Sequence, residues 1–158
     1  MLISATCVLL AMQVGASRLG AAPADDAGFL ISDTNGLAGY WSIEVSPSGA
    51  IIRNMVSSSG PRHVDAETRR RLAGLVFDAG ISGGNRLFGQ CIVDGREREL
   101  RATVSGKRRS VRICDLPATG KVDPEARAAL RTWYGALDVL APGAQREPND
   151  ARILAQQP

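Results

Sequence analysis

Histidine, lysine and cysteine are scarce in this chain of 158 residues, which has one, two and three of them, and only 4% of its residues are aromatic. The sequence has no H-E-x-x-H, no G-x-S-x-G, no Walker-type loop and no paired-cysteine cluster. A metal site or a Ser-His-Asp triad would have to be built around His63, whose nearest carboxylate in the sequence is Asp65. We therefore expect no catalytic, metal or cofactor site, and we interpret His63 as a solvated loop residue or a helix-capping contact.

Long apolar runs are also missing, and the longest one, at residues 2–16, is below the roughly 20 residues that a membrane-spanning helix needs. Small residues follow this run, which is typical of a secretory signal. Cleavage after Ala24 fits the A-x-A rule better than cleavage after Ala16, so we predict a signal peptide at residues 1–24. No Lys or Arg precedes the run, and an uncleaved anchor stays open as the alternative. The predicted protein is exported to the periplasm or the extracellular space, without stable membrane insertion after cleavage.

Loss of the first 24 residues would remove only Arg18 and leave 18 basic and 16 acidic residues. The remaining chain has the length of one domain, which we place at residues 27–141. Residues 142–158 are rich in Gly, Gln, Arg, Asn and Pro and show no apolar periodicity, so we expect a flexible tail. The arginine-rich stretch 96–112 contains no aromatic residue on which a base could stack, so we expect no nucleic-acid partner.

The cysteines fit an exported protein. Cys7 lies inside the predicted signal peptide, so Cys91 and Cys114 remain as a pair where thiols oxidise, and we predict a disulfide between them. Their separation differs from the C-x-x-C spacing of thiol-exchange enzymes, which argues against catalytic redox chemistry. Two buried free thiols that pack as small hydrophobic side chains are the alternative.

Short strand-like runs and turns fill the first half of the predicted domain. Alternation of apolar and polar residues at 40–45 indicates a half-buried strand, and the turn at 46–49 joins it to a second strand as a hairpin. Asp65 is placed to cap a helix that Gly80 ends. We predict strands at 29–32, 40–45 and 50–56.

The second half repeats this order approximately, as a second βββα unit. We predict strands at 87–93, 99–104 and 110–114, the last two joined by a turn at 105–107. The charges of the arginine-rich stretch alternate with apolar residues and are interpreted as a solvated sheet face. Asp123 and Pro124 then mark the start of an amphipathic helix. The pattern as a whole predicts an α+β fold, with an antiparallel sheet of four to six strands and two helices packed on one face.

The turn between the first two predicted strands reads Gly-Leu-Ala-Gly-Tyr-Trp at residues 36–41. Such a turn can present a rigid contact to a partner, with Leu37, Tyr40 and Trp41 as the candidate residues. For Trp41 we favour the alternative that it belongs to the core face of the sheet. Leu37 and Tyr40 stay undecided.

This turn, followed by a helix, further strands and a C-terminal helix, resembles the emfourin-like inhibitors of thermolysin-type metallopeptidases. Those inhibitors have a Gly-Gly-Phe-Ala-Gly turn where this chain has Asn35-Gly36-Leu37-Ala38-Gly39. The resemblance spans residues 29–140. The chain departs from the family pattern by its missing aromatic residue, an extra strand, the insertion around 96–112 and its cysteine pair. The resemblance implies an inhibitor, and no binding residue is carried over.

Export, a small scaffold and the missing catalytic motifs lead us to expect a non-catalytic binding module with a protein partner, in the form of a peptidase inhibitor. One alternative is a small exported enzyme with a dispersed site, using scattered carboxylates or His63. Another is a cell-envelope protein that contacts anionic surfaces through Arg98, Arg101 and Arg112, with binding that weakens in salt.

Overall fold

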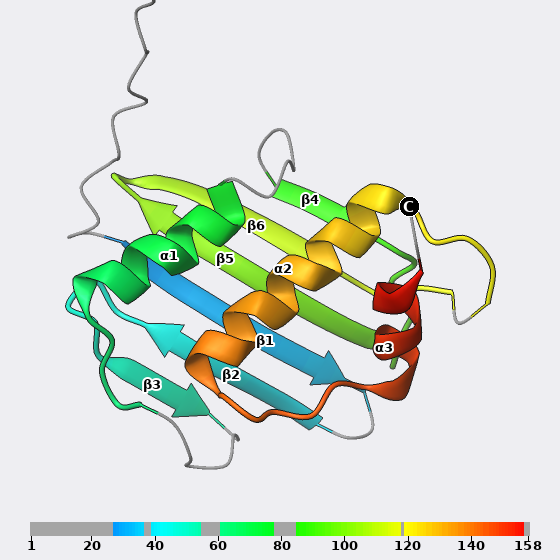
Figure 1. Cartoon of the computed structure of the whole chain (residues 1–158), viewed down its shortest axis with the longest axis horizontal. Helices are drawn as coiled ribbons and strands as arrows, with labels where there is room; N and C mark the ends of the chain where they lie inside the picture. The colour runs from blue at the N-terminus through cyan, green and yellow to red at the C-terminus, as the bar shows by residue number, and fades with distance from the viewer. Residues whose placement is uncertain (1–26, 37–38, 55–60, 78–84, 118, 157–158) are drawn as a thin grey trace, which may run out of the picture.

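The computed structural model describes residues 27–36, 39–54, 61–77, 85–117 and 119–156. This part of the chain folds as α+β, with one six-stranded sheet in the order β3-β2-β1-β5-β6-β4 and three helices (Figure 1). The strands are β1 (Gly28–Asn35), β2 (Gly39–Val45), β3 (Ile51–Asn54), β4 (Asn85–Phe88), β5 (Arg96–Val104) and β6 (Lys107–Ile113). The helices are α1 (Ala66–Phe77), α2 (Pro124–Leu140) and α3 (Pro148–Ala155).

The predicted signal peptide at 1–24 and the candidate contact residue Leu37 lie outside the described residues. Among the residues that are described, none of the helices is long and apolar enough to cross a membrane.

Antiparallel pairing dominates the sheet. β1, β2 and β3 form a meander, β5 and β6 form a hairpin, and the two units join where β1 pairs with β5. Ser105 and Gly106 make the tight turn of the second hairpin with φ values of 50° and 71°, the backbone that a two-residue hairpin turn needs. The expected turn at 105–107 is therefore confirmed.

The sheet is mixed rather than wholly antiparallel, because β4 runs parallel to β6. β5 already occupies the place between β1 and β6, so β4 pairs with the free edge of β6. The strand expected at 87–93 is also shorter, since β4 ends at Phe88 and Gly89 follows with φ of 81°.

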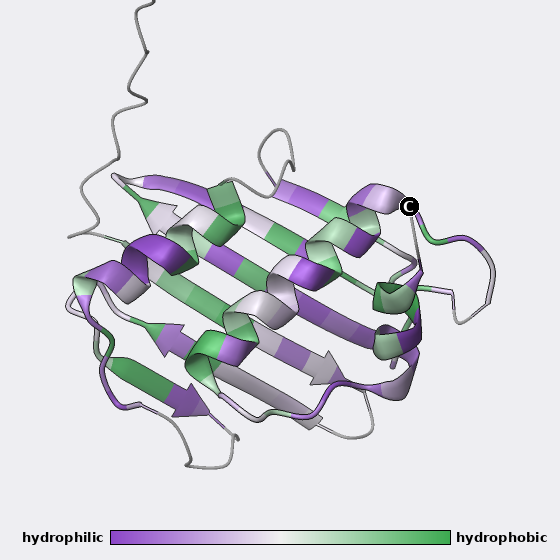
Figure 2. Cartoon of the chain, in the orientation of Figure 1, coloured by the Kyte–Doolittle hydropathy of each residue, from purple (hydrophilic) through white to green (hydrophobic). Residues whose placement is uncertain are grey.

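Helices α1 and α2 cover one face of the sheet (Figure 1). Along the strands hydrophobic and hydrophilic residues alternate, as Figure 2 shows, and the hydrophobic set meets the helices in one core. Both predicted helix starts are confirmed: Asp65 accepts a hydrogen bond from the Thr68 amide at 2.7 Å, which lowers the pKa of its carboxyl. Asp123 accepts from the amides of residues 125 and 126 at 2.7 and 3.1 Å.

A third helix forms where a flexible tail was expected. Helix α3 lies within residues 142–158, and its Ile153 is fully buried in the core. Eight residues are too few to form a stable helix alone, so tertiary contacts hold it in place. Contacts with residues that are distant in the sequence give no local periodic signal, so this helix was not predicted from its own residues.

The other face of the sheet carries no helix in the described part of the chain. We call it the open face, and Leu30, Tyr40 and Glu44 of β1 and β2 point to it. Most of its remaining side chains come from β5 and β6, where residues that face away from the helices alternate with core residues. These open-face residues include Glu97, Glu99, Arg101, Thr103, Arg108 and Arg112.

Candidate functional site

A short loop between β4 and β5, residues 90–95, stands out at one end of the sheet. We call it the disulfide loop, because the structure brings Cys91 and Cys114 to bonding distance with their Cα atoms 5.0 Å apart, as predicted. Cys114 is fully buried and Cys91 is exposed, so the bond ties the loop to the end of β6. Glu97 lies near both sulfur atoms, but sulfurs joined in a disulfide offer no thiolate ligands to a metal ion.

Backbone hydrogen bonds hold the disulfide loop from both sides. The amide of Gln90 donates to the carbonyl of Asp115 at 3.2 Å, and the amide of Arg96 donates to the side chain of Asp115 at 3.2 Å. Within the loop, the Gly95 amide closes a turn on the Ile92 carbonyl at 3.1 Å. A side chain at Gly95 would displace the side chains of Asp115 and Ile92, so the glycine favours this close packing.

The tip of this pinned loop is apolar and points into solvent. Val93 is 91% exposed and Ile92 is 57% exposed. A single exposed apolar side chain is common on protein surfaces, but here two adjacent ones stand on a turn of defined backbone conformation. The loop is therefore a preorganised apolar contact.

The turn after β1 packs directly against the disulfide loop. A side chain at Gly36 would collide with the backbone of Asp94, so only glycine allows the two backbones to approach this closely. Tyr40, 43% exposed at the start of β2, lies at the same end of the sheet. We call this end, with Tyr40, Ile92 and Val93, the turn end.

The two candidate contact residues that the structure describes, Tyr40 and Trp41, do not form one patch. Tyr40 points to the open face, whereas Trp41 points to the helix face and packs against Trp133 with ring centroids 5.7 Å apart. Successive side chains of a strand alternate between faces, so these neighbours cannot share a contact. The favoured interpretation of Trp41 as a core-face residue is confirmed.

Behind Trp41 lies a cleft of about 210 Å³ between the sheet and the segment that follows α2. Trp133 and Tyr134 line it together with Asp33, Arg96 and Glu147. Arg96 donates to both carboxylate oxygens of Asp33 and also pairs with Glu147 at 3.1 Å. Burial opposes the charged guanidinium of Arg96, but these two carboxylates outweigh it and raise its pKa.

A buried ion pair next to this cleft anchors α3. Arg98 pairs with Asp150 of α3, and Tyr134 donates to the same carboxylate at 2.7 Å. Burial, assisted by that hydrogen bond, raises the pKa of Tyr134 to about 12. Arg98 thus lies on the helix face and is only 3% exposed, so its expected place on a solvated surface is wrong. The carboxylate of Asp150 compensates its charge inside the core.

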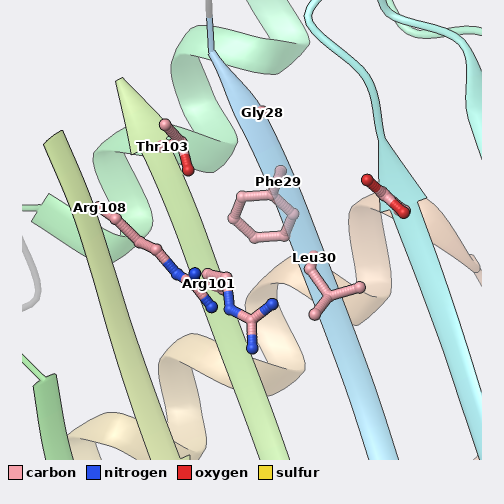
Figure 3. A pocket seen from close by; sticks show the side chains of 7 residues that line it. Gly28, Phe29, Leu30, Arg101, Thr103 and Arg108 are labelled. Atoms are coloured by element: carbon pink, nitrogen blue, oxygen red, sulfur yellow. The ribbon is translucent and has the colours of Figure 1, made fainter. Parts of the chain in front are cut away.

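The open face contains a second hollow, a groove of about 260 Å³ that crosses the four central strands. Figure 3 shows Arg101 and Arg108 beside it, with Leu30 and Thr103. Arg101 is held by Glu99 at 2.6 Å, whereas Arg108 has no hydrogen bond or ion pair within the described part of the chain.

His63 is an exposed loop residue, as expected, but its ring contacts the turn between β2 and β3, a contact that the sequence did not predict. Its Nε2 atom lies 2.9 Å from the Ser48 carbonyl oxygen, which links the segment before α1 to the turn between β2 and β3. Gly49 in that turn has φ of 89°, and the space where its side chain would lie is filled by residues 63 and 64.

Two of these features were missed in the sequence. The Asp94-Gly95 pair is a turn signal that could have placed a loop where we predicted a strand to Val93. The Arg98–Asp150 pair joins residues 52 positions apart and has no local signal.

Comparison with known proteins found no family model that matches the chain, and no curated protein or solved structure that is significantly similar to it.

Proposed function

We propose that this protein is an exported, non-catalytic binding module that inhibits a metallopeptidase, and that the turn end contacts the peptidase. The observation that carries this proposal is the pair Ile92 and Val93, exposed at the tip of a disulfide-pinned loop. The inhibitor class comes from the resemblance of the 35–39 turn to the emfourin-like pattern. That turn and the disulfide loop are in contact through Gly36 and Asp94.

The energetics support a contact at this place. Burying an aliphatic side chain of this size contributes roughly 1.5–3 kcal/mol. A loop already held in one conformation loses little entropy on binding, so more of that free energy is retained as affinity. A convex apolar tip also fits a concave substrate cleft better than a flat protein surface.

The ionisable groups near the turn end support binding rather than catalysis. Asp33 and Glu147 are both engaged by Arg96, and Asp150 is engaged by Arg98 and Tyr134. A carboxylate whose oxygen atoms already accept hydrogen bonds from an arginine is less available to take a proton from a substrate. The raised pKa of Tyr134 keeps its hydroxyl protonated at neutral pH.

The test is a titration of a thermolysin-type metallopeptidase with the purified protein, read out as the rate of peptide hydrolysis. We expect inhibition, and we expect Val93→Asp to weaken it at least tenfold, since a carboxylate at the tip must be desolvated in the complex. Ile52→Asp is the matched control: Ile52 is 60% exposed on β3, away from the turn end, and its replacement should leave inhibition unchanged.

Two results would overturn the proposal. Hydrolysis that continues at the same rate in a large molar excess of the protein would exclude the inhibitor function. Inhibition that Val93→Asp leaves intact, or that Ile52→Asp weakens equally, would show that the turn end is not the contact. Circular dichroism of each variant would separate a lost contact from a lost fold.

A further inference from the structure

We propose that the groove on the open face is a binding site for a small oxyanion, a carboxylate or a phosphate group, held by Arg101 and Arg108. This site is separate from the turn end and does not depend on the inhibitor function.

Arginines outnumber glutamates on the part of the open face that β5 and β6 form. Three arginines and two glutamates of these strands point to this face, and both glutamates are already paired with an arginine. Glu97 accepts two hydrogen bonds from Arg112 at 2.7 Å each, and Glu99 accepts from Arg101 at 3.1 and 2.6 Å. Arg108 is left without a carboxylate in the described part of the chain. One positive charge in this array is therefore uncompensated.

Two of these arginines lie over the groove. Arg101 and Arg108 reach from neighbouring strands over the same groove, and Figure 3 shows the Arg108 side chain extending over β5 toward Arg101, whose guanidinium group points onward toward β1. Two guanidinium groups repel unless an anion lies between them. Glu99 binds Arg101 through Nε and Nη2, so the Nη1 amino group of Arg101 is still available to a ligand.

The other walls of the groove restrict the ligand. Thr103, opposite Arg108 in the strand register, adds a hydroxyl donor, and Leu30 provides an apolar surface. Glu44 lines the side of the groove formed by β2, and its side chain has no ion pair or hydrogen bond in the described part. Its negative charge disfavours a second anionic group at that side. The volume of about 260 Å³ is just below the usual range for ligand pockets, which favours a small molecule.

The experiment is a titration followed by nuclear magnetic resonance, with the whole purified chain, and with sodium phosphate and sodium acetate as separate probes at matched ionic strength. We expect saturable shifts of the side-chain Nε–H signals of Arg101 and Arg108. Arg108→Gln should weaken the binding at least tenfold, whereas Glu44→Gln should strengthen it because a repulsive charge is removed. Arg131→Gln, an exposed arginine on α2, is the matched control and should change nothing.

Saturation with phosphate alone would assign a phosphate-bearing ligand, and saturation with acetate alone would assign a carboxylate. An adventitious ion only would give linear shifts of equal size at Arg108 and Arg131, and that result would overturn the proposal. Binding that Arg108→Gln leaves intact would overturn it as well. The exposed side chain of Arg108 makes no hydrogen bond or ion pair in the described part of the chain, so its replacement is not expected to unfold the protein.

Discussion

Asp150 anchors α3 through buried polar contacts. It is 2% exposed, pairs with the buried Arg98 and accepts the hydroxyl proton of Tyr134 in a hydrogen bond. Removing one partner of a buried ion pair leaves the other charge uncompensated, which typically costs 3–5 kcal/mol. The Nε atom of Arg98 has no hydrogen-bond partner in the described part of the chain, so the pair with Asp150 is the main compensation of this charge.

We therefore expect Asp150→Asn to lower the free energy of unfolding by about 3–5 kcal/mol, measured by urea denaturation. Asp138→Asn is the control, because Asp138 pairs with Arg146 on the surface, where both side chains are about half exposed. An exposed pair contributes about 0–1 kcal/mol. Equal losses in the two variants would contradict the view that burial makes the first pair important.

At the scale of elements, the disulfide loop joins a short edge strand of the sheet to its neighbour. β4 has four residues, lies at the edge and pairs only with β6. The bond between Cys91 and Cys114 crosses 23 positions and lies directly beyond the ends of both strands. It thereby stabilises β4 and the conformation of the Ile92–Val93 tip together.

Replacement of both cysteines by serine should lower the free energy of unfolding by about 3–4 kcal/mol, because the unfolded chain regains loop entropy. Amide hydrogen exchange should accelerate first in β4, while the central strand β1 keeps its protection. Exchange that rises evenly over all strands would show that the bond stabilises the fold as a whole and does not hold this edge. In the inhibition assay, the double variant should bind more weakly than the native protein, because its loop tip is less ordered.

At the scale of the whole molecule, the two faces of the sheet differ in kind. One is covered by α1 and α2 over a single hydrophobic core, and the open face is mainly polar, with one ion pair between β5 and β6 and one within β5. The candidate sites follow this division. The turn end lies where β1 ends and β2 and β5 begin, and the anion groove lies on the open face.

Export is a further prediction that concerns the whole molecule. Recovered from a host that secretes it, the protein should have an intact mass that lacks residues 1–24, and alkylation should reach its two remaining cysteines only after reduction. Mass spectrometry with and without reduction measures both properties at once. A full-length mass with freely alkylated thiols would instead place the protein in the cytoplasm or the membrane.

The sequence by itself determined the local elements. Alternation placed β2, the Asp65 and Asp123 caps placed the helix starts, and the spacing of apolar residues placed the buried side of α2. Each of these features depends on residues within a few positions of one another, so a short segment of the sequence is enough to predict it. The α+β class and the pairing of Cys91 with Cys114 followed from the same local information and from cysteine number.

Only the tertiary structure decided the position of β4, the presence of α3 and the sites. β4 runs parallel to β6 because the chain reverses once in the disulfide loop before β5 and again in the 105–106 turn before β6, and no local pattern records this pairing. Arg98 is buried because Asp150, distant in sequence, compensates its charge. The turn end and the groove bring together side chains from separate strands. Their chemistry depends on distances across the sheet, which are set by pairing and not by sequence order.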